Sequence, residues 1–153
     1  MQETQQAVCR VRQFTRFYMS SLSLLGNRYL GSAYSATEAR VLFELHEHTG
    51  ANAAFIVKKL HLDKSYLSRI LSKFEKNGML RRETSQSDAR SSQLYLTEHG
   101  AAVTEALIQA SNQQIGAQLQ SLTAEDCRAL IQALDTVTAI LTPKEVPYEN
   151  RSL

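Results

Sequence analysis

The stretch AAFIVKKLHLDKSYLSRILSKFEKNG, residues 53–78, decides the fold of this chain. Its apolar positions predict a short amphipathic helix and a longer one, joined by a turn of about three residues. Asn52 and Asp63 precede the two helices as favourable N-caps, and Gly78 follows the second as a favourable end. The apolar stripe of the longer helix consists of Leu67, Ile70, Leu71 and Phe74. This arrangement is typical of a helix-turn-helix.

The opposite face of the longer helix combines hydroxyl groups with cations. Such side chains suit the major groove of DNA, where Arg binds guanine in bidentate fashion and Ser or Lys contacts base edges and phosphates. Contacts to base edges or nearby phosphates are expected from Ser65, Tyr66, Ser68 and Arg69. Contacts to the phosphate backbone are expected from Lys64 and Lys73. An amphipathic helix in a protein that never touches DNA has the same pattern, so this alternative stays open.

A β-hairpin is predicted directly after the two helices. Residues 78–84 and 92–97 alternate between apolar and polar side chains, and the polar segment SQSDARS joins them. A basic ribbon after a recognition helix is a wing, and its tip can enter the minor groove, where Arg is favoured. We expect Arg90 to enter that groove and Asp88 to orient its guanidinium group. Arg81 and Arg82 are expected near the phosphates.

The charge of the chain is concentrated in this region. Residues 58–90 contain nine bases and four acids, a net charge of +5, whereas the whole chain of 153 residues carries +2. A basic segment in an otherwise mildly acidic chain indicates a local partner of negative charge.

Further helices are predicted on both sides of this region. Residues 4–27 have helical spacing, and Ser35 with Glu38 forms a capping box that opens the next helix. After the hairpin, Thr97 caps a long helix with Gly116 as its weak point, and Thr123 caps the last one. The fold class is therefore mainly α with a small β-hairpin wing, a winged helix-turn-helix in the order ααααββαα.

The hairpin also carries the residues of a family resemblance. Asp88 and Arg90, followed after five residues by Leu96 and Thr97, resemble the wing signature of MarR-type winged-helix regulators. The segment LHLDKSYLSRILSKFEKNGMLRR, residues 60–82, is similar to their recognition helix and first wing strand. The resemblance implies a homodimeric regulator, mostly a repressor, that binds a pseudo-palindromic operator in double-stranded DNA and is released by phenolic or anionic ligands or by oxidation.

A narrower resemblance links VRQFTRFY and YSATEARVLFELHEH to the regulator half of proteins that fuse a MarR-type module to a GNAT acetyltransferase. The chain has no room for that enzyme, so the regulatory half of an acetyltransferase system is an alternative function. A dimeric winged-helix module that binds proteins rather than DNA is another.

The last helix has a heptad-like apolar seam, which consists of Cys127, Leu130, Leu134, Val137 and Leu141. With the family resemblance, this seam favours an intertwined helical dimer over packing within one chain. We expect residues 1–30 and 100–153 to form the dimerisation region and residues 31–99 the DNA-binding region.

The sequence contains the fewest signals for the binding of a small-molecule effector. In the family, ligands lie between the dimerisation helices and the winged domain, and the residues expected there are Arg12, Arg16, Tyr18, Tyr29 and Tyr34. Each of them equally suits packing at a junction. Cys9, with Arg10 and Arg12 nearby, is a candidate for oxidation sensing.

Other classes of function find no support in the sequence. The histidines of HEH, residues 46–48, lack the spacing of HExxH, and we expect no metal site and no cofactor. The chain has no nucleophile elbow, P-loop or dinucleotide-binding glycine pattern, so we expect no enzyme. Without a signal peptide or a membrane-spanning run, a cytoplasmic protein with no membrane partner is expected.

Overall fold

The computed structural model describes residues 1–21, 26, 28–84, 87 and 91–143. The chain divides into two compact units, Met1–Ile115 and Gly116–Leu153, and the boundary falls at the glycine that the sequence marks as a weak point. None of the described helices combines the length and the apolar character needed to cross a bilayer.

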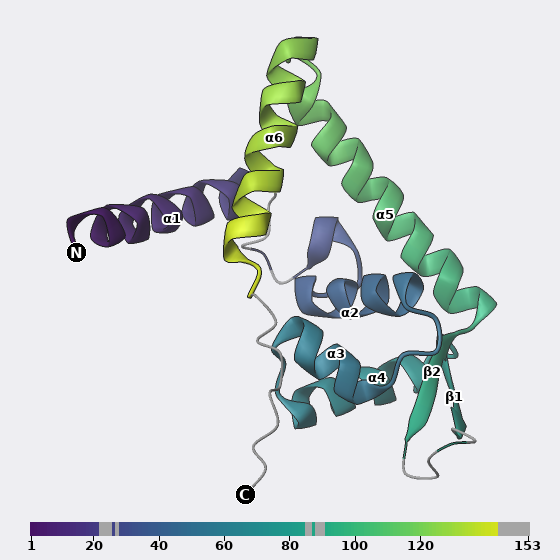
Figure 1. Cartoon of the computed structure of the whole chain (residues 1–153). Coiled ribbons are helices and arrows are strands. Elements are labelled where there is room, and N and C mark those ends of the chain that lie inside the picture. The colour runs from purple at the N-terminus through teal and green to yellow at the C-terminus, as the bar shows by residue number, and fades with distance from the viewer. Residues whose placement is uncertain (22–25, 27, 85–86, 88–90, 144–153) are drawn as a thin grey trace, which may run out of the picture. The chain divides into compact units, whose positions relative to one another are not determined.

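The order of elements agrees with the predicted four helices, hairpin and two helices (Figure 1). The helices are α1 (Gln2–Ser21), α2 (Ala36–Glu47), α3 (Ala53–Leu60), α4 (Lys64–Lys76), α5 (Glu98–Leu119) and α6 (Ala124–Leu141). The strands are β1 (Leu80–Thr84) and β2 (Ser92–Leu96). One element was not predicted: a 3₁₀ turn, η1 (Tyr29–Gly31), lies between α1 and α2 and contains Leu30 in a left-handed conformation, with φ of 51°.

The predicted N-caps are confirmed by hydrogen bonds. The Ser35 hydroxyl accepts from the Glu38 amide at 3.1 Å, and the Glu38 carboxylate accepts from the Ser35 amide at 3.0 Å, which completes the capping box. The side chains of Asn52 and Asp63 cap α3 and α4 at 2.8 and 3.0 Å. Thr123 caps α6 in a second capping box. These local bonds fix where each helix begins.

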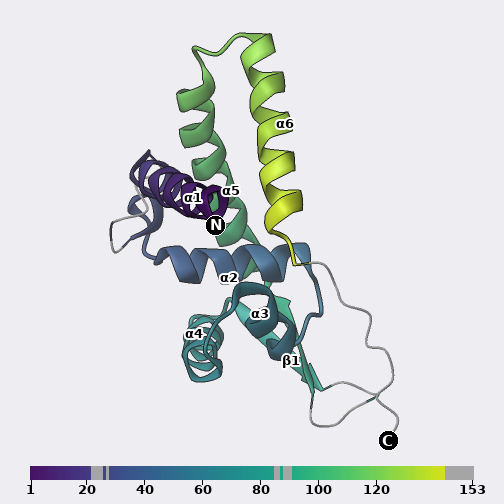
Figure 2. The same cartoon turned by 60° about the vertical axis from the view of Figure 1, so that its left-hand side comes forward.

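The core lies among α2, α3, α4 and the hairpin. The apolar stripe predicted for α4 is buried, and Phe74 at its C-terminal end is fully covered. Helices α3 and α4 lie beneath α2 in both views (Figures 1 and 2). The other buried apolar residues are Ala39, Val41, Leu42, Leu45, Ile56, Met79, Leu80, Leu94 and Leu107. Burial of one face of α4 leaves the opposite face to solvent, and this fixes the position of the candidate site.

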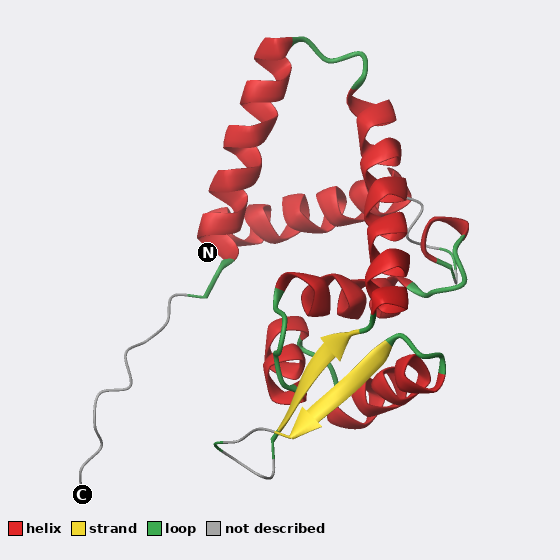
Figure 3. Ribbon diagram, turned by 90° about the vertical axis from the view of Figure 1, so that its right-hand side faces the viewer, coloured by secondary structure: helices red, strands yellow, loops and turns green. Residues whose placement is uncertain are grey.

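The two strands form an antiparallel hairpin whose register decides which side chains face inward (Figure 3). Leu80 pairs with Leu96, and Arg82 pairs with Leu94. Because side chains alternate along a strand, these four residues share the inner face that covers the core. Arg81 pairs with Tyr95 on the outer face.

The segment between α2 and α3 pairs with β2 on the side away from β1. The Gly50 amide donates to the Leu94 carbonyl at 3.1 Å, and the Leu94 amide donates to the Ala51 carbonyl at 2.9 Å. Asn52 forms a bridge to Gln93. The segment between α2 and α3 therefore holds β2 against the helices.

Candidate nucleic-acid interface

The exposed face of α4 is the centre of the candidate interface. All of its polar residues singled out in the sequence are exposed: Lys64, Ser65, Tyr66, Ser68, Arg69, Ser72, Lys73 and Lys76. The Asp63 side chain caps the helix at its start, and a helix N-terminus carries a partial positive charge. The face therefore offers hydroxyl groups and cations on a helix that its buried stripe holds rigidly.

Three cations on this face, Lys64, Arg69 and Lys76, form no ion pair with a described residue. Lys64 and Arg69 lie in the first two turns of α4, about 1.4 turns apart. The Arg69 guanidinium lies 5.7 Å from the centre of the Tyr66 ring, a cation–π distance that orients it along the helix. These two charges are therefore available to an external anion.

Lys73 has a different environment. Its Nζ lies 2.7 Å from Glu38 Oε1 and 5.9 Å from the centre of the Tyr34 ring, and 46% of its side chain is exposed. Lys73 therefore joins the last turns of α4 to the N-terminus of α2, and its expected contact to the phosphate backbone, which stays a prediction, would compete with Glu38. Sequence reasoning missed this pair because the two residues are 35 positions apart.

The two arginines of β1 are also held within the protein. Arg82 Nε donates to Glu75 Oε1 at 2.8 Å, which ties the inner face of β1 to α4. Arg81 lies over the Tyr95 ring at 4.5 Å and pairs with Glu83. Both guanidinium groups are partly exposed, so they lie at the edge of the α4 face rather than inside the core.

The tip of the wing, with Asp88 and Arg90, lies outside the described residues. The residue that follows the tip is described: the Asn52 side-chain amide donates to the Ser91 hydroxyl at 3.4 Å. The start of β2 therefore lies beside the N-terminus of α3.

Comparison with known proteins relates part of this architecture to a family. Residues 34–92 match the model of the MarR family. The helix-turn-helix and the first part of the hairpin are therefore similar to those of MarR-family proteins. A relative from Bacillus subtilis, named organic hydroperoxide resistance transcriptional regulator, is 29% identical over 133 residues, which are 87% of this chain and 84% of the relative.

Solved structures of MarR proteins have a similar fold. Wild-type MarR from E. coli without ligand superposes with a TM-score of 0.70 at 26% identity, over 82% of this chain and 94% of that chain. A mutant of E. coli MarR complexed with operator DNA superposes with a TM-score of 0.68 at 24% identity, over 86% and 95% of the two chains. The relatives from B. subtilis are named as transcriptional regulators, in agreement with the expectation that the protein is no enzyme.

Two of the residues expected to hold an effector pack against the core. Tyr29 packs edge-on against Phe43 at 5.9 Å, and Tyr34 packs against Phe74 at 6.4 Å, with its hydroxyl 3.3 Å from the Met79 sulfur. These two tyrosines therefore belong to the packing around the core. The remaining three, Arg12, Arg16 and Tyr18, are exposed on α1.

An open hollow of about 610 Å³ lies elsewhere in the first unit. It is lined by residues at the η1 turn and on α5: Arg28, Leu30, Gly31, Ala110, Gln113 and Gln114. None of the five expected effector residues lines it. No local pattern in the sequence indicates this hollow, because its two walls are far apart along the chain.

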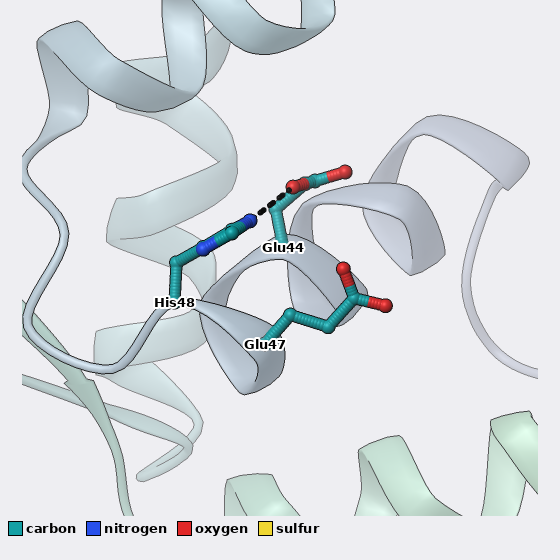
Figure 4. A group of neighbouring side chains, drawn as sticks. All are labelled: Glu44, Glu47 and His48. Carbon is teal, nitrogen blue, oxygen red and sulfur yellow. Dashed lines mark ion pairs between the residues drawn. The ribbon is translucent and has the colours of Figure 1, made fainter.

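The two histidines of the HEH segment contact different residues. His46 Nε2 points to Glu105 on α5 at 3.8 Å, whereas His48 Nε2 lies 3.4 Å from Glu44 Oε2 (Figure 4). Glu44, Glu47 and His48 bring three potential metal-ligand atoms within 4.8 Å of one another. The HExxH pattern does not describe this group, whose signal in the sequence is the spacing E-x-x-E-H on one helix.

Both cysteines are free thiols, and both are half-buried. Cys9 lies on α1, where the oxidation-sensing residue was expected. Cys127 begins the seam of α6, and the apolar residues that follow it in the seam are exposed in the single chain by 36% to 62%: Leu130, Leu134, Val137 and Leu141.

Proposed function

We infer that this protein is a MarR-type, sequence-specific DNA-binding transcriptional regulator that inserts α4 into the major groove. The observation that carries the proposal is the exposed face of α4, where Lys64 and Arg69 lack acidic partners among the described residues while hydroxyl side chains surround them. Arg69, held by Tyr66, is the candidate for a bidentate contact to guanine. Lys64 is the candidate for a phosphate contact. The E. coli MarR mutant solved with operator DNA supports this use of the fold.

The wing extends the proposed footprint. Arg90 would enter the minor groove, with Asp88 orienting it, and Ser65 and Ser68 would complete the major-groove contacts. Arg81 and Arg82 would approach the phosphates from the edge of the face while they hold the wing in place. The hairpin register supports this division, because it assigns Arg82 to the inner face beside α4 and Arg81 to the outer face.

A homodimer is the proposed functional form. None of the residues of α1 or α6 is buried in the single chain, although both helices carry large apolar side chains. On α6, Ile131 is 57% exposed and Ile140 is 74% exposed. Exposed apolar surface of this extent marks an interaction site. A two-fold dimer would also match half-sites about one helical turn of DNA apart.

We further propose that the protein is a repressor and that binding of a small ligand relieves the repression. Arg12, Arg16 and Tyr18 on α1 offer cationic and phenolic groups for a phenolic or anionic effector. Cys9 on the same helix is the proposed oxidation sensor, and the name of the relative from B. subtilis, an organic hydroperoxide resistance regulator, supports it.

The rival proposal is a dimeric winged-helix module that binds proteins, including an acetyltransferase partner. It leaves the unpaired cations of α4 without a role. We therefore favour DNA.

Fluorescence anisotropy with the upstream promoter region of the gene and a scrambled duplex, over a salt series, tests the proposal. Selective binding with a steep negative salt dependence is expected. Arg69→Ala should weaken promoter binding by about 1–3 kcal/mol and lower selectivity. Arg128→Ala removes an equally exposed cation from α6 and should leave binding unchanged. Equal, weak binding to both duplexes that neither variant alters would refute the proposal.

A further inference from the structure

A cluster at the C-terminal end of α2 has no part in the proposed DNA contacts. It consists of Glu44, Glu47 and His48, which lie at positions i, i+3 and i+4 and therefore share one side of the helix (Figure 4). We propose that these three residues form a binding site for a divalent transition-metal ion of the zinc type. The site is separate from the α4 face and goes beyond the proposed function.

The buried carboxylate of Glu44 provides the first argument. Its side chain is only 1% exposed, and Arg40 Nη2 binds one of its oxygens, Oε1, at 2.6 Å. The other oxygen, Oε2, is buried and makes no hydrogen bond in the described part of the chain. A buried carboxylate oxygen without a hydrogen bond is costly, and Glu44 Oε2 is directed toward His48 Nε2. A cation bound there would supply the missing partner.

The distance between the two principal ligand atoms provides the second argument. Zinc binds histidine nitrogen and carboxylate oxygen at about 2.0–2.2 Å, so two ligand atoms at a tetrahedral angle lie about 3.4 Å apart. Glu44 Oε2 and His48 Nε2 are 3.4 Å apart. The two groups therefore already have the separation that a shared tetrahedral ion requires, with no change of backbone.

Charge and access agree with this assignment. Two carboxylates and one guanidinium, from Glu44, Glu47 and Arg40, give the site a net charge of −1 with His48 neutral, which favours a dication. Glu47 is exposed and His48 is half-exposed, so an ion can enter from solvent. Imidazole with carboxylates suits zinc and similar ions better than Mg²⁺ or Ca²⁺, which prefer oxygen ligands. Arg40 would hold the Glu44 carboxylate in its ligating orientation, as outer partners of metal ligands do.

The site would also reach the helix-turn-helix. The His48 ring packs edge-on against Phe55 of α3 at 4.9 Å, and the His48 carbonyl accepts from the Ala51 amide at 3.0 Å. An ion that fixes the His48 ring would therefore fix the entry to α3 as well.

Calorimetric titration of the untagged full chain with Zn²⁺ tests the proposal. One ion per chain is expected, and His48→Ala and Glu47→Gln should each weaken binding by at least about ten-fold. His46→Ala, on the same helix but paired with Glu105, is the matched control and should bind as the wild type does. X-ray absorption at the zinc edge should show nitrogen and oxygen ligands without sulfur, which separates the site from Cys9 and Cys127. Thermal melts without metal verify that each variant is folded.

Two results would overturn the proposal. The first is a wild-type chain that binds no Zn²⁺ more tightly than about millimolar. The second is tight binding that survives the combination of His48→Ala with Glu47→Gln, or that shows sulfur ligands, since the ion would then be held elsewhere.

Discussion

Arg82 on β1 donates from Nε to Glu75 Oε1 on α4 at 2.8 Å, and this pair joins the wing to the recognition helix. The two residues are about equally exposed, by 36% and 35% of their side chains. Because Arg82 also pairs in register with the buried Leu94, the contact fixes the inner face of the strand against the helix. The direction of the wing relative to α4 therefore depends on this pair.

The Arg82–Glu75 pair gives the first prediction. If it acts as an anchor, Arg82→Met and Glu75→Gln should each weaken promoter binding by about five-fold, equivalent to about 1 kcal/mol for a half-exposed pair. Anisotropy at one fixed salt concentration measures both. Promoter binding by Glu75→Gln that equals or exceeds that of the wild type, beside weak binding by Arg82→Met, would show instead that Arg82 acts through the phosphates alone.

The environments of Lys64 and Lys73 predict different salt dependences. Lys64 has no acidic partner in the described residues, so Lys64→Ala should reduce the slope of log affinity against log salt by about one. Lys73 is paired with Glu38, so Lys73→Met should leave that slope unchanged and lower the unfolding free energy by less than about 1 kcal/mol. A slope reduced by Lys73→Met as much as by Lys64→Ala would show that Lys73 is a phosphate contact.

Gly100 lies in the first turn of α5, directly against the backbone of Met79. A Cβ at this position would overlap the Met79 carbonyl oxygen and lie 2.9 Å from its carbon. Since a backbone carbonyl cannot move aside as a side chain can, Gly100→Ala should lower the unfolding free energy by more than about 2 kcal/mol. Chemical denaturation measures this change.

Gly116 on the same helix is the matched control. In the described part of the chain, no atom beyond the neighbouring residues and the helix's own backbone lies within 4 Å of a Cβ at this position, so Gly116→Ala should raise the unfolding free energy by about 0.5–1 kcal/mol through helix propensity. Equal effects of the two substitutions would contradict the close approach at Gly100.

The sequence predicted what depends on neighbouring residues. The caps at Ser35 and Asp63 were confirmed because a cap bonds to amides two or three residues away. The pairing of Lys73 with Glu38 was not predicted, because it depends on how α2 and α4 pack. Tyr34 likewise looked available to a ligand, although its ring packs against Phe74. The sequence therefore predicted which residues lie on the exposed face of a helix, but not which acidic residue pairs with a given lysine or arginine.

The capping box of α6 predicts a pH effect. The Thr123 hydroxyl donates to the Asp126 carboxylate at 2.7 Å and the Thr123 amide donates at 3.1 Å, and these bonds lower the pKa of Asp126 below its usual 3.8. A lowered pKa in the folded state adds stability above pH 3.8, and this contribution is lost as the pH falls through the folded value.

Asp126→Asn should therefore lower the melting temperature at neutral pH, and the difference from the wild type should shrink as the pH falls below 3.8. Thermal melts monitored by circular dichroism over a pH series measure it. A difference that stays constant to the lowest pH would show that the carboxylate charge contributes nothing.

The seam of α6 gives the last prediction. Leu134 and Val137 are 45% and 46% exposed in the single chain, and a second copy would cover them. Because a buried, unpaired lysine is costly, Leu134→Lys should shift the protein from dimer to monomer in light scattering after size exclusion. Promoter affinity should fall with it, since one chain binds only one half-site. Gln132→Lys adds the same charge about 200° around the helix and should remain dimeric. A wild type that is monomeric, or a dimer that Leu134→Lys does not disturb, would refute the seam as the interface.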